Sequence, residues 1–216
     1  YRYGYRHPLL SQQGKHIALV MDFGGGTFDV SIIETTKDGD ISHSGRNSRP
    51  LAAKSIPVGG YFVNRMIAED LLFESIKDKK KKKFAREMLK RIHSFEGITD
   101  AEAGFAPDQE KDFAQNFREL LRDIEGAKIR ICKSISNWNL NSDLSRSVSH
   151  LVPLRSDPFD AESKVYEISL TADRLRKVFV ETVWNNRLRD AILRAVNRAK
   201  TELKNKPISV VLLSGG

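Results

Sequence analysis

One segment, residues 17–33 with the sequence IALVMDFGGGTFDVSII, constrains the fold more than any other part of the chain. Apolar residues alternate before and after its glycine run, which predicts two strands joined by a tight turn. The alternating residues are Ile17, Leu19 and Met21 before the turn and Val30 and Ile32 after it. The sequence therefore predicts a β-hairpin whose tip is rich in glycine.

The tip of this hairpin carries groups suited to phosphate and Mg²⁺. They are Asp22, Gly24, Gly25, Gly26, Thr27 and Asp29. Glycines allow a sharp turn and let a bulky anion approach the backbone amides, and Thr27 adds a hydroxyl donor. The carboxylates of Asp22 and Asp29 lie on either side of the turn and can converge on one hard cation or one water. The alternative is a glycine turn with no ligand. A P-loop is excluded, because no Gly-Lys-Ser/Thr follows.

The string DFGGGTFDVSI resembles the second phosphate-binding hairpin of the Hsp70 branch of the actin-like ATPases. These proteins share a two-lobed α/β fold with actin and the hexokinase-type sugar kinases. The resemblance implies that the glycine loop and Thr27 hold the β- and γ-phosphates of ATP or ADP. It also implies catalytic roles for Asp22 and Thr27, with Asp22 positioning the water or Mg²⁺ and Asp29 assisting Mg²⁺ through water.

A glycine pair before a helix is the second motif. VGGYFVNRM places Gly59 and Gly60 ahead of an amphipathic helix that ends near Ser75, and the free N–H groups of such a helix could face an anion. The alternative is a glycine loop before a packed core helix. The segment resembles the Leu-Gly-Gly-x-x-Phe-Asp-Asn-Arg segment of Hsp70 proteins, with Val63 in place of an aspartate, and this implies nucleotide contact at the glycine pair.

The third motif lies in a long helix predicted over residues 110–136. Glu125 and Lys128 are three residues apart and hence on one helical face, where an ordinary surface ion pair is the alternative to a binding role. The segment from Glu125 to Lys128 resembles the Glu-Arg-Ala-Lys motif that contacts adenosine in Hsp70 proteins. Ile129 stands where the family has a base-stacking arginine, and Cys132 stands where it has a serine near the base.

The fourth motif ends the sequence. A short apolar strand over residues 208–213 is followed by Ser214, Gly215 and Gly216. The resemblance implies that this glycine pair contacts the nucleotide. Because the sequence has no initiator methionine and stops at the pair, we expect a piece of a longer protein, namely the second half of a nucleotide-binding domain.

The four motifs together imply an α/β fold, an actin-like ATPase (ribonuclease H-like) lobe. Residues 1–57 and 171–216 would form the core lobe, and residues 58–170 would form an inserted, helix-rich α+β subdomain. The pattern also predicts helices over residues 84–94 and 191–203, strands over residues 148–154 and 165–170, and a helix N-cap at Thr171. The first lobe, with its own hairpin and catalytic lysine, is missing. We therefore expect negligible ATP hydrolysis and weak binding by this chain alone.

Composition and charge limit which other classes of protein this chain could belong to. The chain has 216 residues, a net charge of +8 and one cysteine, and no apolar run approaches membrane-spanning length. These features favour a cytoplasmic protein that does not enter a membrane. The run KDKKKKK over residues 77–83 could bind nucleic acid, but only Phe84 lies near it, so a solvated helix end is favoured.

For the intact protein, the resemblance implies a chaperone ATPase that couples hydrolysis to polypeptide binding outside this chain. Its expected partners are the first lobe, polypeptide clients, a J-domain-type co-chaperone and a nucleotide exchange factor. Three alternatives remain. The protein could be another actin-like member, either filament-forming or a small-molecule kinase or phosphatase. It could be a regulatory Hsp70 relative with degenerate nucleotide binding. It could also be a nonenzymatic binder that uses the lysine run.

Overall fold

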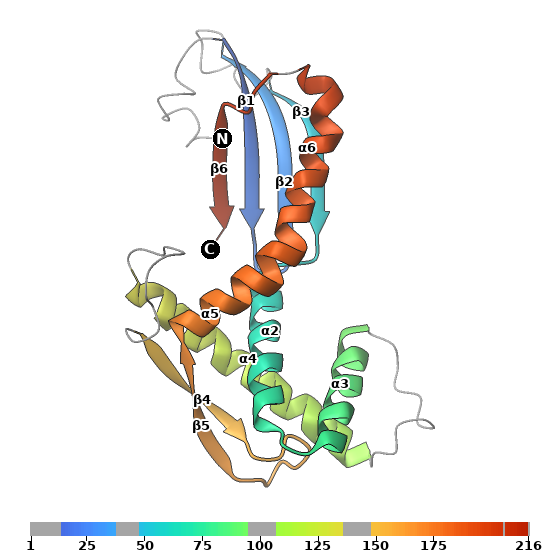
Figure 1. The fold of residues 1–216 in the computed structure, drawn as a ribbon, viewed down its shortest axis with the longest axis vertical. Helices are drawn as coiled ribbons and strands as arrows, with labels where there is room; N and C mark the ends of the chain where they lie inside the picture. Colours follow the sequence, from blue (N-terminus) through green and yellow to red (C-terminus); the bar gives the residue numbers. More distant parts are fainter. Residues whose placement is uncertain (1–13, 38–47, 95–106, 136–147, 205, 216) are drawn as a thin grey trace. The chain divides into compact units, whose positions relative to one another are not determined.

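The computed structural model describes residues 14–37, 48–94, 107–135, 148–204 and 206–215 (Figure 1). The chain divides into two compact units. Unit 1 combines Tyr1–Val63 with Phe179–Gly216, and unit 2 is Asn64–Val178. The boundaries predicted from the sequence were after residues 57 and 170. The observed divisions fall later along the chain, and the first of them lies within a helix.

Unit 1 is built on a mixed four-stranded sheet with the order β3-β2-β1-β6 (Figure 1). Its strands are β1 (Gly14–Phe23), β2 (Phe28–Lys37), β3 (Ser48–Ile56) and β6 (Val210–Gly215). β2 is antiparallel to both β1 and β3, whereas β6 runs parallel to β1. β1 and β2 are the two strands predicted around the glycine run. With the helices described below, the fold is mixed α/β.

Helix α6 (Arg189–Leu203) contacts β3 and β2 and lies across them in Figure 1. Its buried stripe recurs every four residues at Ala191, Ala195 and Ala199. Small side chains at this spacing let a helix approach a sheet closely. The helix ends at Leu203, because the next residue, Lys204, adopts a left-handed conformation with φ 46°.

Unit 2 is organised around the long helix α4 (Pro107–Ser134), which packs against β4 (Ser149–Arg155). β4 pairs antiparallel with β5 (Val165–Thr171) in a separate two-stranded sheet. The buried face of α4 consists of Phe113, Asn116, Phe117, Leu120, Leu121, Ile124, Ala127 and Ile131. This face agrees with the apolar periodicity from which the helix was predicted.

Three further helices belong wholly or largely to unit 2: α2 (Gly60–Ser75), α3 (Lys79–Ser94) and α5 (Ala172–Val178). Thr171 is an N-cap, as predicted, because its hydroxyl accepts a 3.1 Å hydrogen bond from the amide of Arg174. From Phe179 to Leu188 the chain continues in unit 1 as a π-helix, η3, before α6 begins. The N-cap at Thr171 predicted the start of a helix, but nothing in the sequence predicted the π geometry of this later segment.

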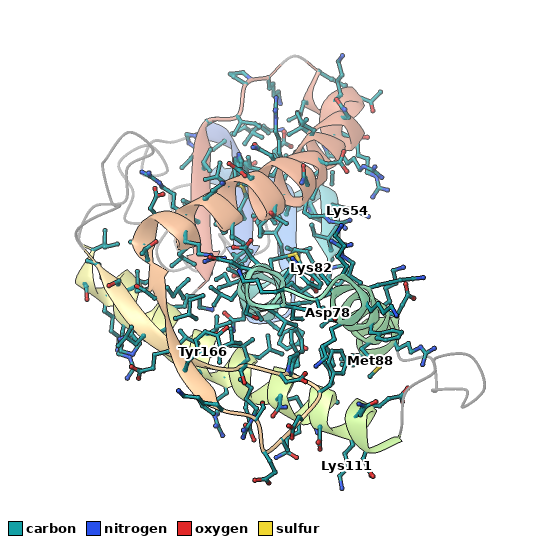
Figure 2. The ribbon with its side chains drawn as sticks, turned by 60° about the horizontal axis from the view of Figure 1, so that its bottom comes forward. Lys54, Asp78, Lys82, Met88, Lys111 and Tyr166 are labelled. Atoms are coloured by element: carbon teal, nitrogen blue, oxygen red, sulfur yellow. The ribbon has the colours of Figure 1, made fainter. Side chains whose placement is uncertain are left out.

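Helix α3 begins earlier than the sequence suggested, so the lysine run lies within its first turns. Asp78 explains the earlier start, because its carboxylate accepts hydrogen bonds from the amides of Lys80 and Lys81 at 2.7 and 3.0 Å. These backbone bonds, that of Lys81 first, hold the pKa of the Asp78 carboxyl below its ordinary value. Figure 2 labels Asp78, Lys82 and Met88 along this part of the chain.

The sequence predicted no membrane-spanning segment, and the helices of the structure can be compared with that prediction. None of those in the described part of the chain has the length and hydrophobicity needed to cross a bilayer.

Candidate functional site

The predicted phosphate loop is a compact connection between β1 and β2. The amide of Gly24 donates a 2.9 Å hydrogen bond to the carbonyl of Thr27, which closes the loop. Asp22 pairs with Asp29, and Phe23 pairs with Phe28, at the last positions of the hairpin ladder. The amides of Gly25, Gly26 and Thr27 donate no hydrogen bond to any residue that the structure describes. Three backbone donors are therefore available at the hairpin tip.

The structure of the loop does not itself require glycine at Gly25 and Gly26. Neither residue has a positive φ, so an ordinary L-residue could adopt either backbone conformation. A Cβ built on either residue meets no atom within 4 Å. The sharp turn invoked from the sequence therefore does not explain these two glycines. Open space above exposed amides is what close approach by an anion needs.

Gly59 has a different role from the one expected. A Cβ at Gly59 would lie 2.5 Å from the carbonyl oxygen of Gly24 and 2.7 Å from backbone atoms of the next two residues. The amides of Gly60 and Tyr61, at the start of α2, donate to the carbonyls of Gly24 and Gly25 at 3.0 and 2.9 Å. These two helix amides are therefore bound to the loop and are not free for an anion. The glycine pair lets the backbone of residues 59–61, which belong to unit 1, lie directly against the hairpin tip.

The carboxyl end of β6 lies beside the carboxyl end of β1, where the glycine loop begins. Gly215 pairs with Phe23, immediately before the glycine loop, because β1 and β6 run parallel. Its φ of 121° and a Cβ position 2.2 Å from the carbonyl oxygen of Phe23 both require glycine there. The structure thus brings three of the four predicted glycine-containing segments together at the carboxyl ends of two parallel strands. Gly216 lies outside the described residues.

The two carboxylates predicted to serve a metal lie on one face of the hairpin. Asp22 and Asp29 are direct cross-strand partners, and both are exposed. Like charges directly opposite each other destabilise an antiparallel pair, and a shared cation would relieve this. Thr27 Oγ1 donates a 2.9 Å hydrogen bond to Asp29 Oδ2. In the described ranges, no three His, Cys, Asp or Glu side chains form a metal-binding group.

The remaining predicted residues lie in unit 2, on one face of α4. Lys128 Nζ lies 2.6 Å from Glu125 Oε2, and the same oxygen accepts a hydrogen bond from Asn64 Nδ2 of α2. Cys132 is one turn further along α4 and is exposed. The surface ion pair considered from the sequence is therefore present, but it is tied to a buried asparagine on a second helix.

Electrostatics favour an ionised Glu125. Burial raises the pKa of its carboxyl, but the hydrogen bonds from Lys128 and Asn64 and the charge of Lys128 outweigh burial and leave the pKa below its ordinary value. Although Cys132 is exposed at the surface, partial desolvation of its sulfur is the main cause of a raised pKa of the thiol, and the charge of Lys128 only partly offsets it.

Asn64 was not proposed as a site residue from the sequence. It is 6% exposed, and its Oδ1 is buried without a hydrogen-bond partner among the described residues. Its match in VGGYFVNRM was the signal that could have identified it. A pocket in unit 2, between α4 and β4, is lined mainly by apolar residues and includes none of the predicted site residues.

No protein-family model matches this sequence, and no curated protein matches it either.

Proposed function

We propose that this chain is the second lobe of an Hsp70-type nucleotide-binding domain of the actin-like superfamily, which binds ATP or ADP with Mg²⁺. One observation carries the proposal: Gly25 and Gly26 have open space and amides that bond no described residue, although the loop does not need glycine at either position. The start of α2 and the end of β6 meet the same loop. In α/β sheets, ligands bind outside the carboxyl ends of the strands.

Each group has a role in this proposal. The amides of Gly25, Gly26 and Thr27 would donate to phosphate oxygens, as backbone amides do in other anion sites. Asp22 and Asp29 would hold Mg²⁺, directly or through water, while the Thr27 hydroxyl fixes the orientation of Asp29. Mg²⁺ neutralises charge on the transferring phosphoryl group when it is bound. Glu125, Lys128 and Cys132 would contact the nucleoside.

In the intact protein, cleft closure around ATP would be coupled to polypeptide binding beyond this chain. Polypeptide clients, a J-domain-type co-chaperone and a nucleotide exchange factor belong to the same proposal and rest on the motifs alone. Cytoplasmic location is part of the proposal as well and rests on the composition of the chain. A filament-forming protein or a small-molecule kinase or phosphatase would use the same hairpin. These alternatives differ from the proposal in what the rest of the protein contains.

A regulatory relative with weakened nucleotide binding is the second candidate function. It is favoured by Ile129, which is 42% exposed on α4 where a base-stacking arginine is expected. An exposed isoleucine offers an apolar contact but no planar guanidinium for stacking on a base. Base affinity would then be reduced while phosphate contacts remain.

The test is Mg-ATP and Mg-ADP affinity, measured by calorimetry on a longer form of the protein that includes the first lobe. Gly25→Val places a side chain over the loop amides and should weaken binding at least about tenfold, equivalent to about 1.4 kcal/mol. Thr36→Val, on β2 away from the tip, is the matched control and should bind normally. Asp22→Ala should lose steady ATP turnover.

Three outcomes would count against parts of the proposal. Unchanged affinity in Gly25→Val would remove the loop from the binding site. Absence of nucleotide binding by the longer form would leave a scaffold or partner-binding role. Measurable steady turnover by the 216-residue chain alone would contradict the need for a first lobe.

A further inference from the structure

The two-stranded sheet of unit 2 has two outer edges. Among the described residues, β4 and β5 pair only with each other. An unpaired strand edge presents a row of N–H and C=O groups that can direct pairing by another strand, and proteins usually protect such edges. The two edges of this sheet differ in their protection.

Two backbone hydrogen bonds show which residues of β4 and β5 direct their backbone groups toward the partner strand. The amide of Ala172 donates to the carbonyl of Val148 at 2.9 Å, and the amide of Ser156 donates to the carbonyl of Lys164 at 2.8 Å. Hydrogen-bonded and non-bonded pairs alternate along an antiparallel ladder. With the observed register, the backbone groups of even-numbered residues therefore face the partner strand. Those of odd-numbered residues point outward on both strands.

Proline protects only one of the edges. Pro153 occupies an outward position of β4 and has no N–H, so the row of donors on that edge is interrupted. The outward positions of β5 are Val165, Glu167, Ser169 and Thr171, all of which keep their N–H groups. The amides of the first three donate no hydrogen bond to any described residue, and their side chains are exposed. Of the two outer edges, only that of β5 offers an uninterrupted row of backbone N–H donors.

We propose that the outer edge of β5 binds an extended polypeptide segment of a partner protein, which adds a third strand to this sheet. Backbone hydrogen bonds supply affinity in this mode of recognition, and alternate side chains supply specificity. Val165, 48% exposed, and Leu151, 54% exposed, lie on the solvent face of the sheet together with Glu167. Tyr166, 36% exposed, lies on the other face and is labelled in Figure 2.

These side chains define the chemistry of the partner. A lysine or arginine beside Glu167 forms a favourable cross-strand pair, and a β-branched residue two positions away packs against Val165. The segment is therefore extended and carries a basic residue flanked by apolar ones on the same face. β5 itself contains no basic residue, so two copies of this chain paired through their β5 edges would leave Glu167 without an opposite charge.

The probe is a capped synthetic peptide of sequence TVTKTVT, titrated against the full chain and followed by fluorescence anisotropy. Ser169→Pro removes an outward amide from β5, and Leu151→Pro removes one from β4 at the position directly opposite. Ser169→Pro should weaken binding at least about tenfold, because a donor is lost and the proline ring blocks the edge. Leu151→Pro should stay within about twofold of the unaltered chain.

A charge exchange keeps the test decisive if either proline variant fails to fold. Glu167→Lys should weaken binding of TVTKTVT and restore binding of TVTETVT. N-methylation of alternate peptide amides should abolish binding, and hydrogen exchange should slow at Val165, Glu167 and Ser169 only with the unmethylated peptide. Equal binding by both proline variants, or no binding by the unaltered chain, would overturn the proposal. Self-association that Ser169→Pro abolishes would assign the edge to a second copy and would likewise overturn it.

Discussion

The hairpin tip of unit 1 and the α4 face of unit 2 were both predicted to contact a nucleotide, but they are built from different chemical groups. The tip offers backbone amides, open space and two carboxylates. The α4 face offers side chains, with Glu125 held between Lys128 and Asn64. A backbone site depends on where glycine is placed, whereas a side-chain site depends on charge and hydrogen bonding. The two regions should therefore respond to different substitutions.

The glycines of unit 1 are of two kinds, those that the fold requires and those that it does not. Gly59 and Gly215 are required by close backbone contacts, which would exist with or without a ligand. Gly25 and Gly26 have no such requirement. A glycine that the fold does not need is a better indication of function than a glycine that the fold cannot replace. Sequence motifs do not separate these two kinds, because both are written as Gly-Gly.

Gly59→Ala should have the largest effect on stability. Its Cβ would lie 2.5 Å from a backbone oxygen and could be accommodated only by moving the backbone of residues 59–61 away from the loop. We expect a loss of about 3 kcal/mol in the free energy of unfolding, measured by urea denaturation. Gly126→Ala in α4 is the control, because its nearest contact is the end of the flexible Arg130 side chain. A loss no larger than that of the control would mean that the α2 contact is not rigid.

Asn64→Ala tests the side-chain region and should have the next largest effect. It removes a charge-assisted hydrogen bond to Glu125, but it also removes a buried oxygen that lacks a partner, and these two effects oppose each other. The net loss should be about 1 kcal/mol, again by urea denaturation. Asn64→Asp should lower the free energy of unfolding more than Asn64→Ala does, because it would bury a second carboxylate beside Glu125. Greater stability in Asn64→Asp would show that this region is not electrostatically arranged as described.

Glu125 should make a smaller, pH-dependent contribution. Its pKa in the folded state lies below the ordinary value of 4.5, so its contribution to stability is complete above that pH and is lost as pH falls through the folded pKa. The side chain is 44% exposed, so solvent screening keeps the contribution below about 1 kcal/mol. Between about pH 5 and about pH 3, the unaltered chain should lose more stability than Glu125→Gln. Equal slopes for the two proteins would show that the pKa of Glu125 does not change on folding.

Much of this fold follows from local sequence patterns. Alternation around the glycine run predicted β1 and β2, and the apolar stripe of α4 predicted a long helix close to its observed bounds. The cap at Thr171 was also predicted correctly. The lysine run is a solvated helix end, as favoured from the sequence, because the lysines in the first turn of α3 are exposed. The predicted start of this helix was too late, because the cap formed by the Asp78 carboxylate was not predicted.

The site residues were harder to interpret because their roles depend on tertiary contacts. Nothing in VGGY indicates that the amides after Gly59 bond the hairpin carbonyls, because those carbonyls are far away in sequence. The link from Asn64 to Glu125 likewise joins residues on two helices. The π geometry of η3 has no sequence signature that we identify.

Gly25→Ala should have the smallest effect on stability and separates a ligand-binding glycine from a structural one. The added methyl group meets no atom within 4 Å, and the backbone conformation suits alanine. The free energy of unfolding should therefore change by no more than about 0.5 kcal/mol, and alanine could even stabilise by restricting the unfolded chain. If the same substitution weakens Mg-ADP binding in the longer protein, the open space serves the ligand. A loss comparable to that of Gly59→Ala would instead show that the loop glycines are structural, and the distinction on which the proposed function depends would fail.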